Sequence, residues 1–296
     1  MSGPVSDMNR VLDLVSEAVR SRQCILFLGA GVHAPPPEGS RFSYPSEHRP
    51  PIGAALSRQL AAACDYEERF PGHDVHDMKR VSLAYEIDRS RGHLVEAITQ
   101  AVSTGKEPSP MLNALARLDF PLVITTNYDP LFERALQSAG KQPRVAVYSP
   151  DPGQTMADFR QATPESPVLY KLHGDIARAG SLVVTDEDYI QFVLRMSDKE
   201  PYDPIPLSLK FFLTGSTTLF VGYSLIDYNL RLLFKTLRWK MDAANVPAMY
   251  SVDRSPDPLI LAVWQSQRRY VKFIVEDVWS FVPRLYERVC GEELAP

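Results

Sequence analysis

Short apolar runs alternate with helical patterns along most of the chain. The run at residues 24–28 is entirely apolar and follows a helical pattern at 11–20. Six further strands are expected at 122–126, 144–148, 168–172, 218–221, 248–252 and 271–275. Repeated strand-then-helix order favours a parallel sheet covered by helices on both faces. The predicted fold class is therefore α/β, a Rossmann-like parallel sheet flanked by helices.

One stretch interrupts this alternation. Residues 52–64, 75–89, 93–102 and 110–118 all show helical spacing, and no convincing strand lies between them. Six prolines between Pro35 and Pro51 forbid a regular element there and predict a long loop. Without a linker or repeat, we expect one catalytic domain over residues 1–296, with a helical insert at 52–118.

The long loop carries an aromatic segment, Phe42-Ser43-Tyr44-Pro45. Exposed aromatic residues beside a ligand site can serve as a lid or an assembly contact. An ordinary surface loop is the simpler interpretation, since long loops vary freely. The sequence leaves both interpretations open.

Composition and charge narrow the class of protein. The 296 residues are 45% hydrophobic, and 32 basic against 36 acidic residues give a net charge of -4. This balance gives no general attraction to nucleic acid or anionic lipid, so neither direct nucleic-acid binding nor membrane binding is expected. The first residues lack the features of a secretory signal, and no apolar run reaches the roughly 20 residues that span a bilayer. We expect a cytoplasmic protein.

The cysteines point away from disulfides and structural zinc. Cys24, Cys64 and Cys290 are widely spaced, and none forms a Cys-x-x-Cys pair. Reduced, mostly buried thiols are expected. The segment His73-Asp74-Val75-His76 lacks a third ligand at informative spacing, so a metal site is disfavoured there.

Two glycine turns follow predicted strands. Gly29-Ala30-Gly31 would let backbone N–H groups approach a pyrophosphate, although a tight turn without a ligand needs the same residues. Gly222-Tyr223-Ser224 repeats this arrangement, although Ser224 could merely start the next helix. Each turn alone is a weak signal.

Polar side chains follow two other strands. Asn127 and Asp129 come directly after one apolar run, and Asn offers both a donor and an acceptor to a ligand. An Asx turn in which Asp129 caps the next helix is the structural alternative. His173 follows another apolar run, and its imidazole is suited to accept a proton near neutral pH.

Two helix starts also contain acidic residues. Thr185-Asp186-Glu187-Asp188 resembles a capping box, and Asp227 is suited to cap a helix at 230–237.

Taken together, these blocks resemble the sirtuin (silent information regulator) superfamily. The chain is most similar to the zinc-free sirtuin-like NAD hydrolases of prokaryotic antiphage defence, over nearly its whole length. The Thr-Asn-Tyr-Asp, Leu-His-Gly and Gly-Tyr-Ser-x-x-Asp blocks occur here in the same order as in that family. The set is specific, whereas each member alone is not.

The resemblance implies roles for individual residues. Asn127 and His173 would form the catalytic pair at an accessible loop edge, outside the core, and Asp129 would contact the nicotinamide side. Gly29-Ala30-Gly31 and Gly222-Tyr223-Ser224 would cradle NAD, and Asp253, a looser match, would meet the adenosine ribose. The implied reaction is NAD⁺ glycohydrolysis to nicotinamide and ADP-ribose, with NAD as substrate and no metal.

The chain departs from the family at several points. His33 stands where a small hydroxyl residue is usual, and the Pro-Asp-Phe-Arg segment of deacylating sirtuins is absent. The zinc cysteines are missing too, and the helical insert would take the place of the zinc module. Deacylation is therefore disfavoured, but an NAD-dependent protein deacylase and a non-catalytic NAD or ADP-ribose sensor remain alternatives.

Control of such an activity is also implied only by resemblance. We expect a homo-oligomer, as a ring or filament, or a separately encoded partner such as a hexameric ATPase or a short Argonaute-like protein.

Overall fold

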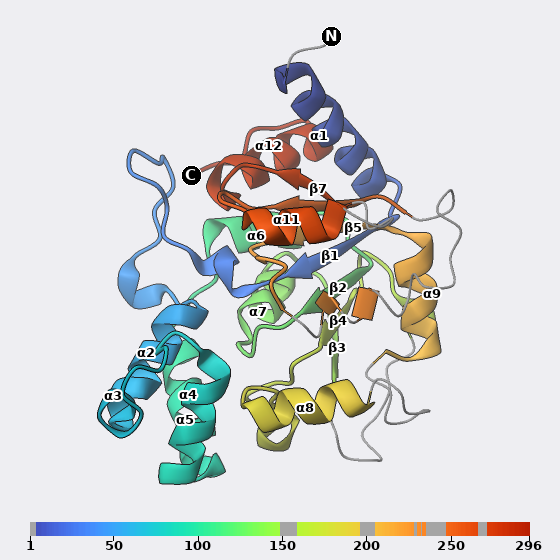
Figure 1. The fold of residues 1–296 in the computed structure, drawn as a ribbon. Helices are drawn as coiled ribbons and strands as arrows, with labels where there is room; N and C mark the ends of the chain where they lie inside the picture. The colour runs from blue at the N-terminus through green and yellow to red at the C-terminus, as the bar shows by residue number, and fades with distance from the viewer. Residues whose placement is uncertain are drawn as a thin grey trace.

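A seven-stranded parallel sheet forms the centre of the molecule (Figure 1). The computed structural model describes residues 4–148, 159–195, 205–227, 230–231, 233–234, 247–265 and 271–296. The strands are β1 (Cys24–Leu28), β2 (Leu122–Thr125), β3 (Arg144–Val147), β4 (Val168–Lys171), β5 (Thr217–Val221), β6 (Met249–Val252) and β7 (Val271–Ile274). Their order is β3-β4-β2-β1-β5-β6-β7, and all neighbours run parallel. The predicted α/β, Rossmann-like fold class is confirmed, and each expected strand is present to within one residue.

Helices cover both faces of this sheet. One layer contains α1 (Pro4–Arg20), α6 (Pro110–Arg117), α7 (Leu131–Ser138) and α12 (Val278–Cys290). The other contains α8 (Asp186–Arg195), α9 (Leu207–Gly215) and α11 (Pro258–Gln265). Successive strand side chains point to opposite faces, so Leu26 and Leu28 join the first core while Ile25 and Phe27 join the second. Residues of β1 are therefore buried on both sides.

A small helical lobe has a core of its own. It contains α2 (Gly53–Ala63), α3 (Tyr66–Arg69), α4 (Met78–Asp88) and α5 (Arg91–Val102). Their apolar faces form a third cluster, which Leu182 and Val184 join from the segment before α8. In contrast, α6 packs on α7 and α12 in the sheet layer. The limits of the insert at 52–118 stay a prediction, and within that range only residues before α6 belong to the third cluster.

Short 3₁₀ helices and polar caps connect these elements. The 3₁₀ helices are η1 (Ala30–His33), η2 (Ser46–His48), η3 (Phe159–Gln161) and η4 (Ala179–Ser181). The capping box before α8 is confirmed: Asp188 N–H donates to Thr185 Oγ1, and Thr185 N–H donates to Asp188 Oδ2. The expected helix at 230–237 lies partly outside the described residues.

The proline-rich loop packs against the C-terminal helix. Phe42 and Tyr44 are buried, and their rings lie 6.3 and 6.2 Å from that of Trp279 on α12. The expectation of exposed aromatic residues is wrong at these two positions, because Trp279 covers them. Among the described helices, none is long and apolar enough to cross a membrane.

Candidate functional site

The turns after β1 and β5 touch each other directly. Gly29 N–H donates to Val221 O at 3.0 Å, and Gly31 N–H donates to Gly222 O at 2.9 Å. A Cβ atom added at Gly31 would lie 2.8 Å from Gly222 O, and Gly222 itself has φ +68°. Close contact between the turns and a left-handed backbone therefore explain these glycines. In this structure the amides of Gly29 and Gly31 are engaged within the fold, contrary to the expectation that they face a pyrophosphate.

A pocket of about 240 Å³ opens beside these two turns. It lies where the strand order reverses, because the chain places β2 on one side of β1 and β5 on the other. Open α/β sheets bind ligands at such a switch point. Five of the predicted cofactor residues line it: Gly31, Gly222, Tyr223, Ser224 and Asp253. Gly29 and Ala30 do not. We call this cavity the β1–β5 pocket.

The far wall of the β1–β5 pocket carries acidic and aromatic groups. Asp253 follows β6 and accepts a hydrogen bond from Ser255 N–H at 2.9 Å. Glu276 and Asp277 come from the turn after β7, and Trp279 follows them. The Trp279 indole donates to Ala34 O at 3.1 Å, which fixes the ring against the wall. Carboxylates and an aromatic ring are suited to hydroxyl groups and a flat base.

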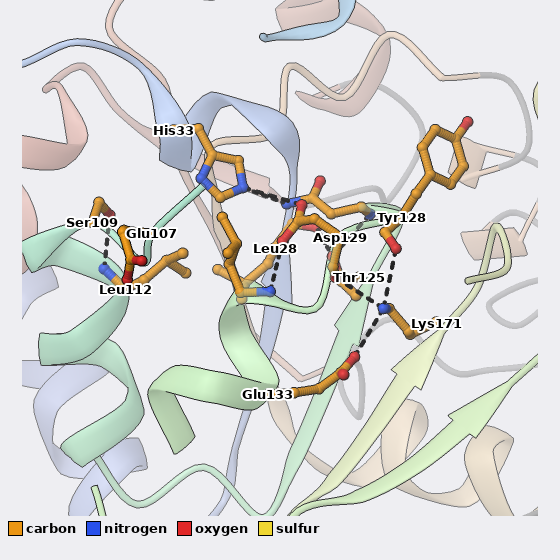
Figure 2. Close-up of polar contacts among 12 residues, drawn as sticks. Leu28, His33, Glu107, Ser109, Leu112, Thr125, Tyr128, Asp129, Glu133 and Lys171 are labelled. Atoms are coloured by element: carbon orange, nitrogen blue, oxygen red, sulfur yellow. Dashed lines mark hydrogen bonds and ion pairs between the residues drawn. The ribbon is translucent and has the colours of Figure 1, made fainter. Parts of the chain in front are cut away.

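The turn after β2 is held by its own side chains (Figure 2). Thr125 Oγ1 donates to Leu28 O and accepts from Asn127 N–H, both at 3.0 Å. Asp129 Oδ1 accepts from Leu131 N–H at 2.9 Å. This is the Asx-turn contact at the start of α7 that the sequence offered as the alternative to ligand binding. Asn127 remains partly exposed at the carboxyl edge of the sheet.

The second oxygen of Asp129 meets a histidine that sequence reasoning did not select. His33 Nε2 lies 3.3 Å from Asp129 Oδ2 and 3.5 Å from Asn127 Nδ2 (Figure 2). Burial alone would raise the pKa of Asp129, but His33 and Leu131 N–H hold it below its usual range. In the sequence, His33 stands out only as a departure from a family pattern. This unusual residue was the feature of the sequence that could have identified His33 as part of the site.

A buried lysine lies beneath the same turn. Lys171, at the end of β4, is 0% exposed, and its Nζ donates to Asp129 O at 2.9 Å and to Tyr128 O at 3.3 Å (Figure 2). Nζ also lies 2.7 Å from Asp175 Oδ2 and 2.8 Å from Glu133 Oε1. Burial would lower the pKa of Lys171, yet these two carboxylates raise it. The ammonium therefore stays charged and fixes the backbone of the turn.

His173 lies after β4, at the carboxyl edge of the sheet as expected. Its side chain, however, is 2% exposed and packs edge-on against Tyr189 and Phe192 of α8, at 5.3 and 5.6 Å between ring centres. The expectation of an accessible side chain outside the core is wrong, because α8 covers the ring. Burial lowers the pKa of His173, so the imidazole is neutral at pH 7. Within the described residues, no hydrogen bond joins it to Asn127.

Asp227 organises the region next to His173. Its Oδ2 lies 3.9 Å from His173 Nε2 and accepts from the hydroxyls of Tyr223 at 3.1 Å and Tyr189 at 3.5 Å. The Asp227 carbonyl also accepts from Arg231 N–H. The contacts of the Asp227 carboxylate were not predicted from the sequence. The Gly-Tyr-Ser-x-x-Asp block nevertheless offered a signal for one of them, because it places Tyr223 and Asp227 four residues apart.

Other histidines and acids do not gather in this way. His76 Nδ1 pairs with its neighbour Asp74 at 3.0 Å, and the ring of His73 packs on Phe70. A search over the described part of the chain finds no group of three or more His, Cys, Asp or Glu side chains arranged to hold a metal ion. Cys24 and Cys64 are buried free thiols, whereas Cys290 is exposed.

Comparison with known proteins adds a family relationship. A model of the SIR2-like domain matches residues 121–272, a range that includes Asn127, His173 and Gly222. NAD(+) hydrolase ThsA of Acinetobacter baumannii (strain 532279) is 28% identical over 296 residues, covering 94% of this chain and 55% of that protein. NAD(+) hydrolase ThsA of Bacillus cereus (strain MSX-D12) is 32% identical over 162 residues, 53% of this chain and 32% of that protein.

Defense-associated sirtuin 2 of Bacillus subtilis is 29% identical over 155 residues, covering 51% of this chain and 14% of that protein. The chain thus spans about half the length of the Acinetobacter relative and a smaller share of the two Bacillus proteins.

Proposed function

Because the chain belongs to the SIR2-like domain family, we propose that it is an NAD⁺ glycohydrolase that releases nicotinamide from NAD. The observation that carries this proposal is the placement of the β1–β5 pocket. It contains Asp253 at one end and is linked by the turn of residues 31–33 to Asn127 and Asp129. Three sequence blocks named in the resemblance therefore converge on one edge of the sheet. Relatives named as NAD(+) hydrolases support the same reaction.

The adenosine end of NAD would occupy the β1–β5 pocket. Asp253 would accept hydrogen bonds from the ribose hydroxyls, as acidic residues do in dinucleotide folds. Gly31, Gly222 and Ser224 would lie along the phosphates at the mouth of the two turns. The amides of Gly29 and Gly31 already donate hydrogen bonds within the fold. Their main contribution would be to let the phosphates come close to the backbone, since glycine has no Cβ atom.

The reacting end would lie at the turn after β2. Asp129 would orient the carboxamide, because a carboxylate oxygen can accept more than one hydrogen bond and so keep His33 as well. Asn127, which is partly exposed, would position the ribose or the attacking water. Lys171 would hold this turn in place through the carbonyls of Tyr128 and Asp129.

His173 would act as general base. Its neutral imidazole would take a proton as the water oxygen bonds to the ribose carbon and the bond from that carbon to nicotinamide breaks. The transition state would resemble an oxocarbenium ion, so positioning supplies most of the acceleration. Because Tyr189 and Phe192 cover the ring, we expect α8 to move when substrate binds.

In the cell, this activity would deplete NAD during defence, as the name of the Bacillus subtilis relative suggests. Unregulated NAD hydrolysis would harm the host. We therefore propose that the chain acts in the cytoplasm under control of self-assembly into an oligomer or of a separately encoded partner, such as a hexameric ATPase or a short Argonaute-like protein. A chain that is monomeric and fully active by light scattering and turnover measurements would contradict this control.

The test is product analysis with NAD by chromatography, with and without an acetylated peptide. We expect nicotinamide and ADP-ribose to form in equal amounts without the peptide. Asn127→Ala should abolish release, and so should His173→Asn, whereas His93→Asn, an exposed histidine on α5, should retain it. Thermal unfolding confirms that each variant is folded. Peptide-dependent release or wild-type turnover by Asn127→Ala would refute the proposal.

A further inference from the structure

A second, larger pocket lies on the other side of the 31–33 turn. It has a volume of about 450 Å³, is open to solvent, and is bordered by the proline-rich loop, α2 and α5. Its lining residues are His33, Pro35, Ser46, Arg49, Pro50, Pro51, Ile52, Gln59, Gln100, Ala101, Thr104 and Lys106. We call it the α2–α5 pocket. The proposed reaction assigns it no role.

The lining of the α2–α5 pocket is cationic. Arg49 and Lys106 carry positive charge, and none of the twelve lining residues is acidic. The acids nearby make other contacts: Glu107 pairs with Arg134 at 2.9 Å, and Asp129 contacts His33. Glu47 accepts from Ser46 Oγ at 3.2 Å; hydrogen bonds lower its pKa most, and Arg49 contributes to this lowering without forming an ion pair with it. Positive charge without an ion-pair partner in a concave site attracts anions.

Both cations are available to a ligand. The half-buried Arg49 guanidinium forms no hydrogen bond or ion pair with another described residue. Lys106 Nζ donates to the carbonyl of Glu47 at 3.0 Å, and an ammonium group has three donors, so two remain. Holding an unpaired charged group in a partly buried position costs free energy. Two such groups at one pocket therefore point to a role in binding.

His33 gives a second, independent observation. The residue is 3% exposed and lines the pocket, and its Nδ1 has no hydrogen-bond partner among the described residues. Buried polar atoms are normally satisfied, so an unpaired ring nitrogen at a pocket wall indicates a missing ligand or water. Its other nitrogen, Nε2, is the atom that contacts Asp129.

We propose that the α2–α5 pocket binds a small phosphorylated molecule, with the phosphate between Arg49 and Lys106. Phosphate is favoured because a guanidinium donates two parallel hydrogen bonds to its oxygens and an ammonium adds a point charge. Gln59, Gln100 and Thr104 offer donors and acceptors to the body of the ligand. The volume lies in the usual range for small-molecule sites.

The two pockets differ in charge. The β1–β5 pocket has three acids in its wall and one cation, whereas the α2–α5 pocket has no acid. The four charged residues of the β1–β5 pocket are Asp253, Glu276, Asp277 and Arg254. The positively charged nicotinamide ring of NAD is electrostatically disfavoured beside Arg49 and Lys106. The second site is therefore distinct from the one proposed for NAD.

Isothermal titration of the purified chain with inorganic phosphate, ribose 5-phosphate and glucose 6-phosphate tests this inference. We expect saturable binding of at least one of them. Arg49→Gln and Lys106→Gln should each weaken that binding at least about tenfold, as loss of a charge-assisted hydrogen bond does. Arg58→Gln removes the same charge from an exposed position of α2 and should change it less than about twofold. Equal affinities indicate that the phosphate group alone is recognised, and tighter binding of ribose 5-phosphate or glucose 6-phosphate indicates a sugar phosphate.

Independent variants separate this site from the NAD site. Asp253→Asn should leave phosphate binding unchanged, and the titration needs no NAD hydrolysis, so failure of the proposed reaction would not affect the result. If thermal unfolding shows that Arg49→Gln is unfolded, Lys106→Gln decides the outcome. No saturable binding by any of the three probes, equal weakening by Arg58→Gln, or loss of binding in Asp253→Asn would overturn the inference.

Discussion

His33 Nε2 lies 3.3 Å from Asp129 Oδ2, and both side chains are buried. The contact links the turn after β1 to the turn after β2, two segments that the chain separates by 96 residues. Since Asp129 also accepts from Leu131 N–H, its carboxylate is fixed at both oxygens. The orientation of a candidate substrate-binding group thus depends on a residue from a different loop.

This coupling is measurable by a double-mutant cycle. His33→Ala should destabilise the fold by about 2 kcal/mol, because it removes a buried hydrogen bond to a charged group. Asp129→Asn keeps the bond to Leu131 N–H but loses the charge. Urea unfolding of both single variants and the double variant should give a coupling energy of about 1 kcal/mol or more. Additive effects would show that the two side chains do not interact in solution.

Lys171→Met should be among the most destabilising substitutions in the chain. It leaves Glu133 and Asp175 without their cation and two carbonyls without a donor, at a cost of about 3 kcal/mol or more. Lys141→Met is the matched control, since Lys141 donates to Leu118 O and has only a 3.9 Å ion pair, with Asp119. Urea unfolding gives both values, and similar losses would contradict a special role for Lys171.

His173 should make the protein sensitive to mild acid. Its pKa in the folded state is lowered by burial, so below about pH 6.5 the unfolded chain binds a proton that the folded chain resists. Stability should therefore fall as the pH drops from 7.5 to 5.5, and the fall should be smaller in His173→Gln. His93→Gln, which removes an exposed imidazole, should follow the wild-type curve. Parallel curves for all three proteins would mean that His173 titrates normally in the folded state.

Asp253→Asn should weaken NAD binding about tenfold, because an amide accepts ribose hydroxyl donors less strongly than a carboxylate does. Asp257→Asn provides the control: Asp257 accepts from Ile260 N–H at the start of α11 and does not line the β1–β5 pocket. Calorimetric titration with NAD gives both affinities. An unchanged affinity for NAD in Asp253→Asn would show that the adenosine ribose does not bind at Asp253.

Gly222→Ala should cost at least about 2 kcal/mol. A Cβ atom there would collide with Val32 N and come within 2.8 Å of the Gly31 carbonyl carbon, in a backbone with φ +68°. Gly53→Ala, at the start of α2 with nothing within 4 Å, should be neutral or slightly stabilising. Thermal unfolding distinguishes the two. Equal melting temperatures would show that the turns after β1 and β5 can separate freely.

The sequence indicated the strands because each is a short apolar run bounded by polar or glycine residues. It did not indicate strand order, since β4 lies between β2 and β3 and no local pattern encodes that choice. Asn127, Asp129 and His173 were placed at the correct edge by the rule that loops follow strand ends. The burial of His173 was missed because Phe192 and Tyr189, which cover it, lie on a helix well downstream.

Lys171 and His33 show the same limit more clearly. A lysine in an apolar strand normally extends to the surface. Lys171 is completely buried because Asp175 and also Glu133, 38 residues away in the sequence, lie next to its ammonium group. Likewise, the sequence showed His33 as an unusual residue but not its distance from Asp129. Pairings between distant loops are decided by packing and not by local pattern.

The position of Trp279 gives the protein an intrinsic optical reporter. Its indole lines the β1–β5 pocket, whereas Trp264, the other tryptophan among the described residues, is buried on α11 in the opposite core. A nucleotide base entering the pocket would quench or shift the emission of Trp279 while leaving that of Trp264 unchanged. Occupancy of the pocket can thus be followed in real time, without label or turnover, through a side chain that also holds the proline-rich loop in place.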